Sequence, residues 1–175
     1  EGLKNRQNAL LITFQHDQRA LVEMSRSWGV FLGRYAEDGQ VEILHRSSIG
    51  LSVDQLLYEL RERLRMLSPA RVAVDGLTHL IQAIDDESYL LDYTGALLRL
   101  FACHGVTSVF TLEVDKMFGS FEVDSQRSLG LFDKLVLMRY VEVEGDIRRA
   151  IAILKMRGTD QQKSIQEFQI GKNGI

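Results

Sequence analysis

Short apolar runs alternate with segments of helical periodicity along the first two thirds of the chain. The apolar runs are typical of strands and occupy residues 8–15, 40–45, 71–77 and 106–113. Apolar residues three and four positions apart predict helices over residues 18–28, 52–67 and 87–104. Strands and helices that alternate through short connections are typical of a mostly parallel sheet. We therefore predict an α/β fold in which helices flank the sheet.

The last third of the chain predicts antiparallel strands instead. Two long strand-like runs, residues 134–143 and 147–157, flank the turn Glu144-Gly145-Asp146 and predict a β-hairpin. Residues 164–170 predict a last strand, and residues 115–130 a long loop beside the strand ends. The expected architecture is a parallel core that ends in an antiparallel hairpin edge, within one domain spanning residues 1–175.

Composition narrows the class of protein. A length of 175 residues and a hydrophobic content of 45% suit one globular domain with a proper core. No apolar run approaches the roughly 20 residues that a membrane helix needs. The formal charge of −3 gives no overall attraction to nucleic acid or to an anionic membrane. The single Cys103 predicts a buried, reduced thiol and a cytoplasmic location, and we also place Phe14 and Trp28 in the core.

The run Arg71-Val-Ala-Val-Asp75 provides the first candidate functional residue. Its three consecutive apolar residues predict a strand buried on both faces, and an aspartate closes it. Ligands of parallel α/β sheets bind beyond the carboxyl ends of the strands, so Asp75 points to a site there. The alternative is that Asp75 caps the following turn.

The order of these elements resembles a known family. The block Lys155-Met156-Arg157-Gly158 in the predicted hairpin, followed by Glu167-Phe168-Gln-Ile170, closely resembles the end of the KaiC-like ATPase domains, a branch of the RecA-type P-loop family. The strand Leu11-Ile-Thr-Phe14, the pair Trp28-Gly29, the Asp75 strand and Thr111-Leu-Glu113 follow in the family's order. The resemblance covers nearly all of the chain and implies a RecA-like fold.

The resemblance also implies a function. It implies an ATP site between neighbouring subunits of a ring, usually a hexamer, in signal transduction or clock-like regulation with a signalling protein as partner. Asp75 would be the Walker B carboxylate that holds Mg²⁺. The Lys155-Met156-Arg157 block would reach the nucleotide of the adjacent subunit, where cations stabilise charge on the phosphates. Arg149, Lys163 and Ile170 match positions that line the adenine or the phosphates; ordinary surface charge is the alternative for them.

Two departures from the family pattern bear on activity. The P-loop motif Gly-x-x-x-x-Gly-Lys-Ser/Thr precedes the Leu11 strand in this family but is absent from these 175 residues. We expect its strand and helix to lie upstream of Glu1, which makes the domain N-terminally incomplete; the alternative is that the natural protein has lost them.

The second departure concerns the water-activating base. Family members place glutamates after the first strand, where this chain has Gln15 and His16. A glutamine orients water but accepts no proton, so we expect slow or absent hydrolysis, with His16 as an alternative base. Glu113, at the end of another strand, is a candidate to sense the γ-phosphate or to pair with a basic neighbour.

Two other functions remain open at this stage. One is a degenerate, non-hydrolysing domain that serves as an assembly or protein-interaction module. The other is a recombinase-like ATPase that binds single-stranded DNA. The chain has no basic stretch interleaved with aromatic residues, so we do not expect nucleic acid as a partner, and we expect no membrane association.

Overall fold

The computed structural model describes residues 2–113, 127–158 and 164–171. The chain divides into two compact units, Glu1–Glu113 and Val114–Ile175, and each is described here by itself. The expectation of a single domain over residues 1–175 remains a prediction.

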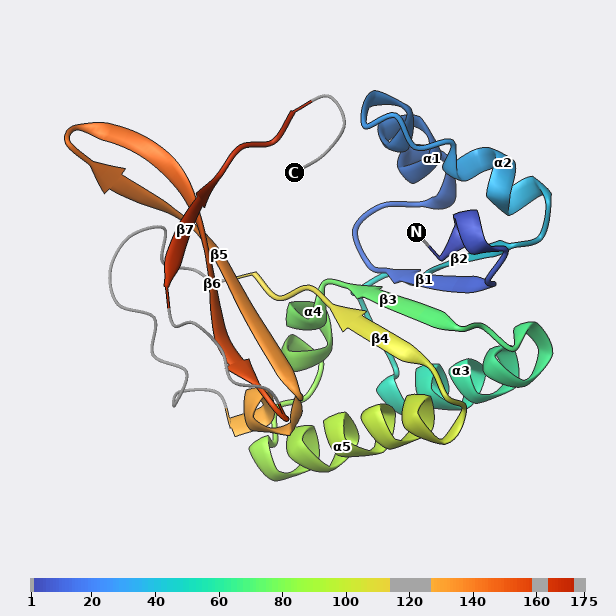
Figure 1. Cartoon of the computed structure of the whole chain (residues 1–175). Helices are drawn as coiled ribbons and strands as arrows, with labels where there is room; N and C mark the ends of the chain where they lie inside the picture. The colour runs from blue at the N-terminus through green and yellow to red at the C-terminus, as the bar shows by residue number, and fades with distance from the viewer. Residues whose placement is uncertain (1, 114–126, 159–163, 172–175) are drawn as a thin grey trace. The chain divides into compact units, whose positions relative to one another are not determined.

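A four-stranded parallel sheet forms the centre of the first unit (Figure 1). Its strands are β1 (Ala9–Thr13), β2 (Val41–His45), β3 (Arg71–Asp75) and β4 (Thr107–Phe110), in the order β2-β1-β3-β4. Thr13 lies beside His45 on one neighbouring strand and beside Asp75 on the other. The last residues of three strands are therefore aligned in register at one end of the sheet.

Helices cover both faces of this sheet (Figure 1). The long helices α3 (Val53–Leu67) and α5 (Glu87–Cys103) run along one face, and α1 (Gln18–Ser27) and α2 (Leu32–Glu37) lie on the other side. Ser52 and Asp86 cap α3 and α5 by accepting hydrogen bonds from backbone N–H groups. The innermost side chains come from strands and helices alike: Leu10, Ile12, Leu60, Leu64, Val72, Val74, Leu80, Leu97 and Phe101. The α/β prediction is confirmed.

Two short helices were absent from the sequence prediction. α2 forms between the predicted helix over residues 18–28 and the predicted strand over residues 40–45, and α4 (Leu77–Gln82) begins directly after Gly76. Both helices have six residues, and neither has a side-chain hydrogen bond at its N-cap. Segments this short carry too few apolar positions to show a helical period.

Two core assignments are wrong. Trp28 follows the last residue of α1, where the chain turns at Gly29 (φ 70°), and its side chain is 54% exposed. Cys103 is exposed because it ends α5 two positions after the buried Phe101, which places it on the other side of the helix. Phe14 is buried, as predicted.

The second unit contains an antiparallel sheet of three strands, β5 (Lys134–Val143), β6 (Asp146–Met156) and β7 (Ile165–Phe168), in the order β5-β6-β7. A 3-10 helix, η3 (Arg127–Leu131), precedes it. Glu144 (φ 53°) and Gly145 (φ 85°) join β5 to β6 with two positive φ values, the geometry of a tight hairpin turn. The predicted hairpin and last strand are confirmed, and in the described residues they form a sheet of their own.

None of the helices in the described ranges is long and apolar enough to span a bilayer.

Candidate functional site

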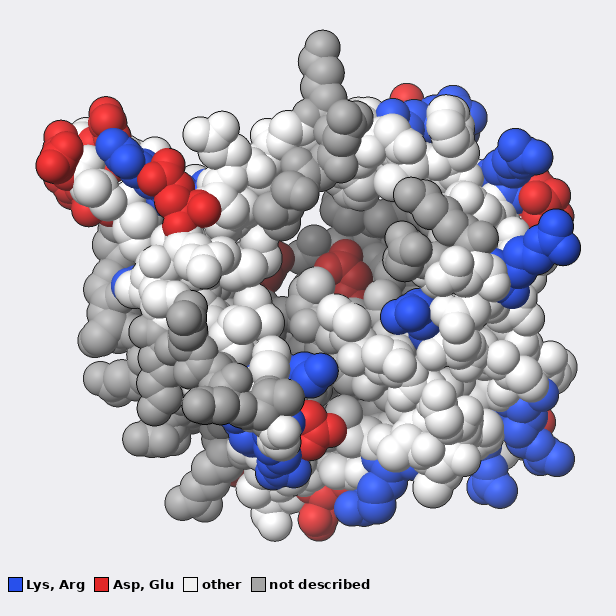
Figure 2. All heavy atoms as spheres, viewed as in Figure 1, with Lys and Arg blue, Asp and Glu red and all other residues white. Residues whose placement is uncertain are grey.

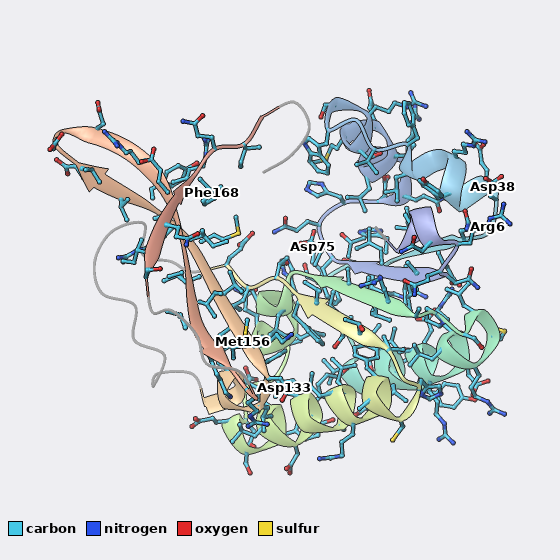
Figure 3. All side chains as sticks on the ribbon, in the orientation of Figure 1. Arg6, Asp38, Asp75, Asp133, Met156 and Phe168 are labelled. Carbon is cyan, nitrogen blue, oxygen red and sulfur yellow. The ribbon has the colours of Figure 1, made fainter. Side chains whose placement is uncertain are left out.

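The carboxyl ends of β1 and β3, with the segment after β4, bring the predicted site residues of the first unit together. We call this region, residues 13–16, 75–78 and 111–113, the carboxyl edge. Thr13 and Asp75 are register partners, so the residues that follow β1 and β3 leave the sheet side by side. Figure 3 shows Asp75 at the end of β3. The parallel topology thus places Asp75 where ligands of such sheets bind.

Asp75 is held by Thr111. The Thr111 hydroxyl donates a hydrogen bond to Oδ1 of Asp75 at 2.7 Å and accepts one from the backbone N–H of Gly76 at 2.9 Å. The Asp75 side chain is half-buried, and no cation pairs with it in the described part of the chain. The Asp75 carboxylate does not cap α4, since that helix has no side-chain cap. A fixed carboxylate with acceptor capacity to spare suits Mg²⁺, which prefers oxygen ligands and keeps several waters.

Gly76 makes this arrangement sterically feasible. Its φ of 97° is one that side-chain-bearing residues rarely adopt, and a Cβ here would lie 2.8 Å from Cδ2 of His79. The His79 ring in turn packs against Phe14, with ring centroids 5.7 Å apart. Glycine at this position therefore lets α4 start immediately after the Asp75 strand.

Gln15 and Glu113 meet at the same edge, although 98 residues separate them. Nε2 of Gln15 donates a hydrogen bond to Oε1 of Glu113 at 3.3 Å. The backbone N–H of Glu113 donates to Oγ1 of Thr78 at 3.3 Å. Among the described residues the side-chain partner of Glu113 is a neutral amide, and its pairing with a basic neighbour stays a prediction.

His16 is close by but less constrained. Its backbone N–H donates to the hydroxyl of Thr13 at 3.3 Å, and Thr13 is fully buried. No side-chain hydrogen bond orients the His16 ring among the residues that the structure describes. The sequence analysis missed the three threonines of this edge, Thr13, Thr78 and Thr111, because their role is visible only through contacts with distant parts of the chain.

The two hairpin cations of the second unit converge on one carbonyl group. Nζ of Lys155 donates to the oxygen of Gly130 at 2.7 Å, and one guanidinium nitrogen of Arg157 lies 3.5 Å from the same oxygen. Arg157 also pairs with Asp133 at 3.2 Å. Lys155 and Arg157 thus share one face, as strand alternation predicts, and Met156 between them belongs to the other face (labelled in Figure 3).

A pocket of about 340 Å³ lies elsewhere on the second unit. Arg149 and Ile170, two of the predicted residues, line it together with Tyr140 and Phe168. The guanidinium carbon of Arg149 lies 5.6 Å from the centroid of the Tyr140 ring, a cation–π contact. Lys163 lies outside the described residues. Lys155 and Arg157 do not line this pocket.

Charges are mixed on the face of the molecule that Figure 2 shows. Lys and Arg side chains alternate with Asp and Glu over the first unit, and acidic side chains gather at the tip of the β5–β6 hairpin, where the sequence has Glu142, Glu144 and Asp146. In the described residues no three His, Cys, Asp or Glu side chains form a metal-binding cluster. Asp75 is thus not part of a multi-residue metal cluster among these described residues.

Comparison with known proteins identifies the family of this chain. A family model described as "ATPase: KaiC" matches residues 1–175. The circadian clock protein KaiC3 of a Synechocystis strain is 26% identical, over 99% of this chain and 34% of that protein. The circadian clock oscillator proteins KaiC of Parathermosynechococcus lividus and Synechococcus elongatus are each 24% identical, over 99% and 97% of this chain and 32% and 33% of their own lengths.

The chain spans about a third of the length of these curated relatives. The family match, in contrast, covers every residue of the chain, including the Asp75 strand and the Lys155-Met156-Arg157 block. This chain therefore belongs to the KaiC ATPase family and is similar over its whole length to domains of circadian clock proteins.

Proposed function

We propose that this chain forms part of a Mg-ATP site that is shared between neighbouring copies in a homo-oligomeric ring, a hexamer. One copy contributes the carboxyl edge, and the next contributes the hairpin cations. The observation that carries the proposal is the position of Asp75, which ends a central parallel strand, is held by Thr111, and keeps acceptor capacity free for a metal-bound water.

The carboxyl edge supplies the magnesium side of the site. Asp75 would hold Mg²⁺, and the Mg²⁺ would neutralise charge on the phosphates. The P-loop that cradles phosphates in this fold class is not among these 175 residues. The proposal therefore assigns the metal and its surroundings to this chain and leaves the cradle to residues outside it.

The hairpin supplies cations to the nucleotide of the adjacent copy. Lys155 and Arg157 share one face of β6, and the Arg157 side chain is 60% exposed. Its pair with Asp133 is an exposed ion pair, which water screens and a phosphate group would displace readily. Met156 lies between them on the opposite face of the strand.

The second-unit pocket is proposed to receive the adenine side of the nucleotide. Tyr140 and Phe168 offer flat apolar surface, Arg149 a planar cation, and Ile170 an aliphatic wall. Flat rings and guanidinium groups stack on nucleobases. Lys163, outside the described residues, is proposed from the family resemblance as a ligand of the adenine or the phosphates.

The biological setting is proposed from the relatives. Their names describe circadian clock proteins. We propose that this chain acts in clock-like regulation or signal transduction in the cytoplasm, through a signalling protein that reads the nucleotide state of the ring.

The test is the binding of Mg-ATP to the full-length protein by titration calorimetry. The wild type should bind ATP with Mg²⁺ present, and Asp75→Ala should weaken this affinity at least about tenfold because the metal loses its protein carboxylate. Asp38→Ala is the matched control, since Asp38 lies at the end of α2 and forms an exposed ion pair with Arg34. Equal affinity in all three proteins would remove the proposal.

One observation favours a second candidate, a non-hydrolysing assembly module. Gln15 stands where the family places a glutamate, and an amide accepts no proton from water. Under this alternative the full-length protein would bind Mg-ATP and form its ring, and no phosphate release would follow. A phosphate-release assay on the assembled protein separates the two functions.

A further inference from the structure

We infer that Glu113 supplies the carboxylate that activates the attacking water, with Gln15 as the residue that positions it. The inference rests on the proposed function, because it assigns a role within the same Mg-ATP site. It follows from the contact between these two side chains, which places a carboxylate from the β4 segment beside the position where a base is expected after β1.

The contact leaves the carboxylate able to act. Gln15 uses one amide N–H to reach Oε1 of Glu113, and a carboxylate has about four acceptor sites on its two oxygens. Within the described residues no hydrogen bond is made to Oε2, which can therefore accept one from water. Both side chains are exposed, so water reaches them.

The backbone of this segment is tied firmly to β3 and α4. Thr111 N–H donates to the oxygen of Val74 at 3.0 Å, and Leu77 N–H donates to the oxygen of Thr111 at 2.8 Å. The N–H of Glu113 is bound by the hydroxyl of Thr78. These bonds hold Glu113 two residues after the threonine that binds Asp75, in the same segment after β4. The same segment after β4 thus carries Glu113 and holds Asp75.

The proposed reaction is the hydrolysis of ATP, and its only reactants are ATP, water and the Glu113 carboxylate. The Glu113 carboxylate takes one proton from water while the water oxygen forms a bond to the terminal phosphorus. The bond from that phosphorus to the bridging oxygen of the leaving ADP breaks with its electron pair. Glu113 then returns the proton to bulk water. Through its hydrogen bond, Gln15 orients the Glu113 carboxylate at the carboxyl edge.

His16 is the competing base, and the structure favours it less. A base in catalysis needs a fixed orientation toward the proton that it takes. The described residues orient the backbone of His16 through Thr13, but none makes a hydrogen bond to its ring. Glu113 is fixed through both its side chain and its backbone.

The experiment measures ATP binding and phosphate release separately in the full-length protein. Glu113→Gln should lower the turnover number about 10²-fold to 10⁴-fold and leave the Kd for Mg-ATP within about twofold. Gln15→Ala should lower turnover less, about tenfold, with unchanged binding. Glu62→Gln, an exposed carboxylate on α3, is the control and should keep both values.

Chemical rescue separates a base from a structural residue. Glu113→Ala leaves an exposed gap, and added formate or acetate should restore part of its turnover because a small carboxylate can take the proton instead. The inference would be overturned by normal turnover in Glu113→Gln, by a loss of turnover in His16→Ala but not in Glu113→Gln, or by the absence of rescue by formate. ATP binding without turnover in the wild type would overturn it too and leave nucleotide binding intact. Absence of ATP binding would remove the proposed function itself.

Discussion

The hydroxyl of Thr111 links the carboxylate of Asp75 to the start of α4. It donates to Oδ1 of Asp75 at 2.7 Å and accepts from the N–H of Gly76 at 2.9 Å, across 36 and 35 residues of sequence. One side chain from the segment after β4 thereby fixes both the orientation of the Asp75 carboxylate and the turn that follows it.

Replacement of Thr111 tests this link. Thr111→Val keeps the shape and removes both hydrogen bonds, so we expect a loss of about 1 kcal/mol in the free energy of unfolding and a weaker Mg²⁺-dependent affinity for ATP, about tenfold. Thr111→Ser should retain both properties. Thr107→Val, at the other end of β4, is the control. If Thr111→Val binds Mg-ATP as the wild type does, the hydroxyl does not position Asp75.

Gly76→Ala tests the steric role of the glycine. The variant combines an unfavourable φ of 97° with a Cβ 2.8 Å from His79, whereas Gly39→Ala has a similar φ of 72° and open space around it. Gly39→Ala should cost about 1 kcal/mol. Gly76→Ala should cost clearly more, and adding His79→Ala should recover the difference. Denaturant unfolding of these three variants and of His79→Ala alone measures the difference; equal costs at Gly76 and Gly39 would exclude a clash.

Arg157→Ala tests the hairpin cations. Since the pair between Arg157 and Asp133 is exposed (60% and 76%), its loss should leave the melting temperature unchanged. Turnover should fall about 10³-fold because the transition-state charge loses its guanidinium. Lys134→Ala, an exposed lysine on β5 of the same hairpin, is the control and should have normal turnover. A lower melting temperature with normal turnover would make Arg157 a structural residue.

Tyr93 predicts a loss of stability at alkaline pH. Its hydroxyl donates to the oxygen of Val53 at 2.9 Å in the core between α3 and α5, and burial, with the nearby charge of Asp54, raises the pKa of Tyr93. An unfolded tyrosine loses its proton near pH 10, while the folded one keeps it, so the folded state binds more protons above that pH. Stability should therefore fall as the pH rises through about 10.

Tyr93→Phe removes the titrating group and should flatten this decline. It should also cost about 1 kcal/mol at neutral pH through the lost hydrogen bond. Tyr58→Phe, with a side chain that is 68% exposed, should keep the wild-type profile. Urea unfolding between about pH 8 and about pH 11 gives both quantities; identical slopes in Tyr93→Phe and the wild type would contradict the assignment.

The elements that carry a local signal could be predicted from the sequence. Three consecutive apolar residues and a terminal carboxylate predict the Asp75 strand. Two long strand-like runs around Gly145 predict the hairpin. The six-residue helices α2 and α4 could not be predicted, because their stability comes from packing rather than from a period of their own. Trp28 lies outside the core because the chain turns at Gly29.

Several residues of the candidate site could be predicted from the sequence, but the hydrogen bonds between them could not. Gln15 and Glu113 were each identifiable from their places after strands. Their hydrogen bond joins positions 98 residues apart and depends on the strand order, which the sequence does not state. The same holds for Thr111, which follows β4 and reaches Asp75 because β4 lies beside β3. Strand order, more than residue type, decides which groups form the site.

Mixing two inactive variants tests the shared site most directly. Asp75→Ala disables the carboxyl edge of a copy, and Arg157→Ala disables its hairpin cation. If each site takes Asp75 from one copy and Arg157 from the next, rings reassembled from an equal mixture should contain intact sites at about one interface in four and recover about a quarter of the wild-type ATP turnover. Recovery of no activity above that of either variant alone would contradict the account, because each copy would then build its site from its own residues.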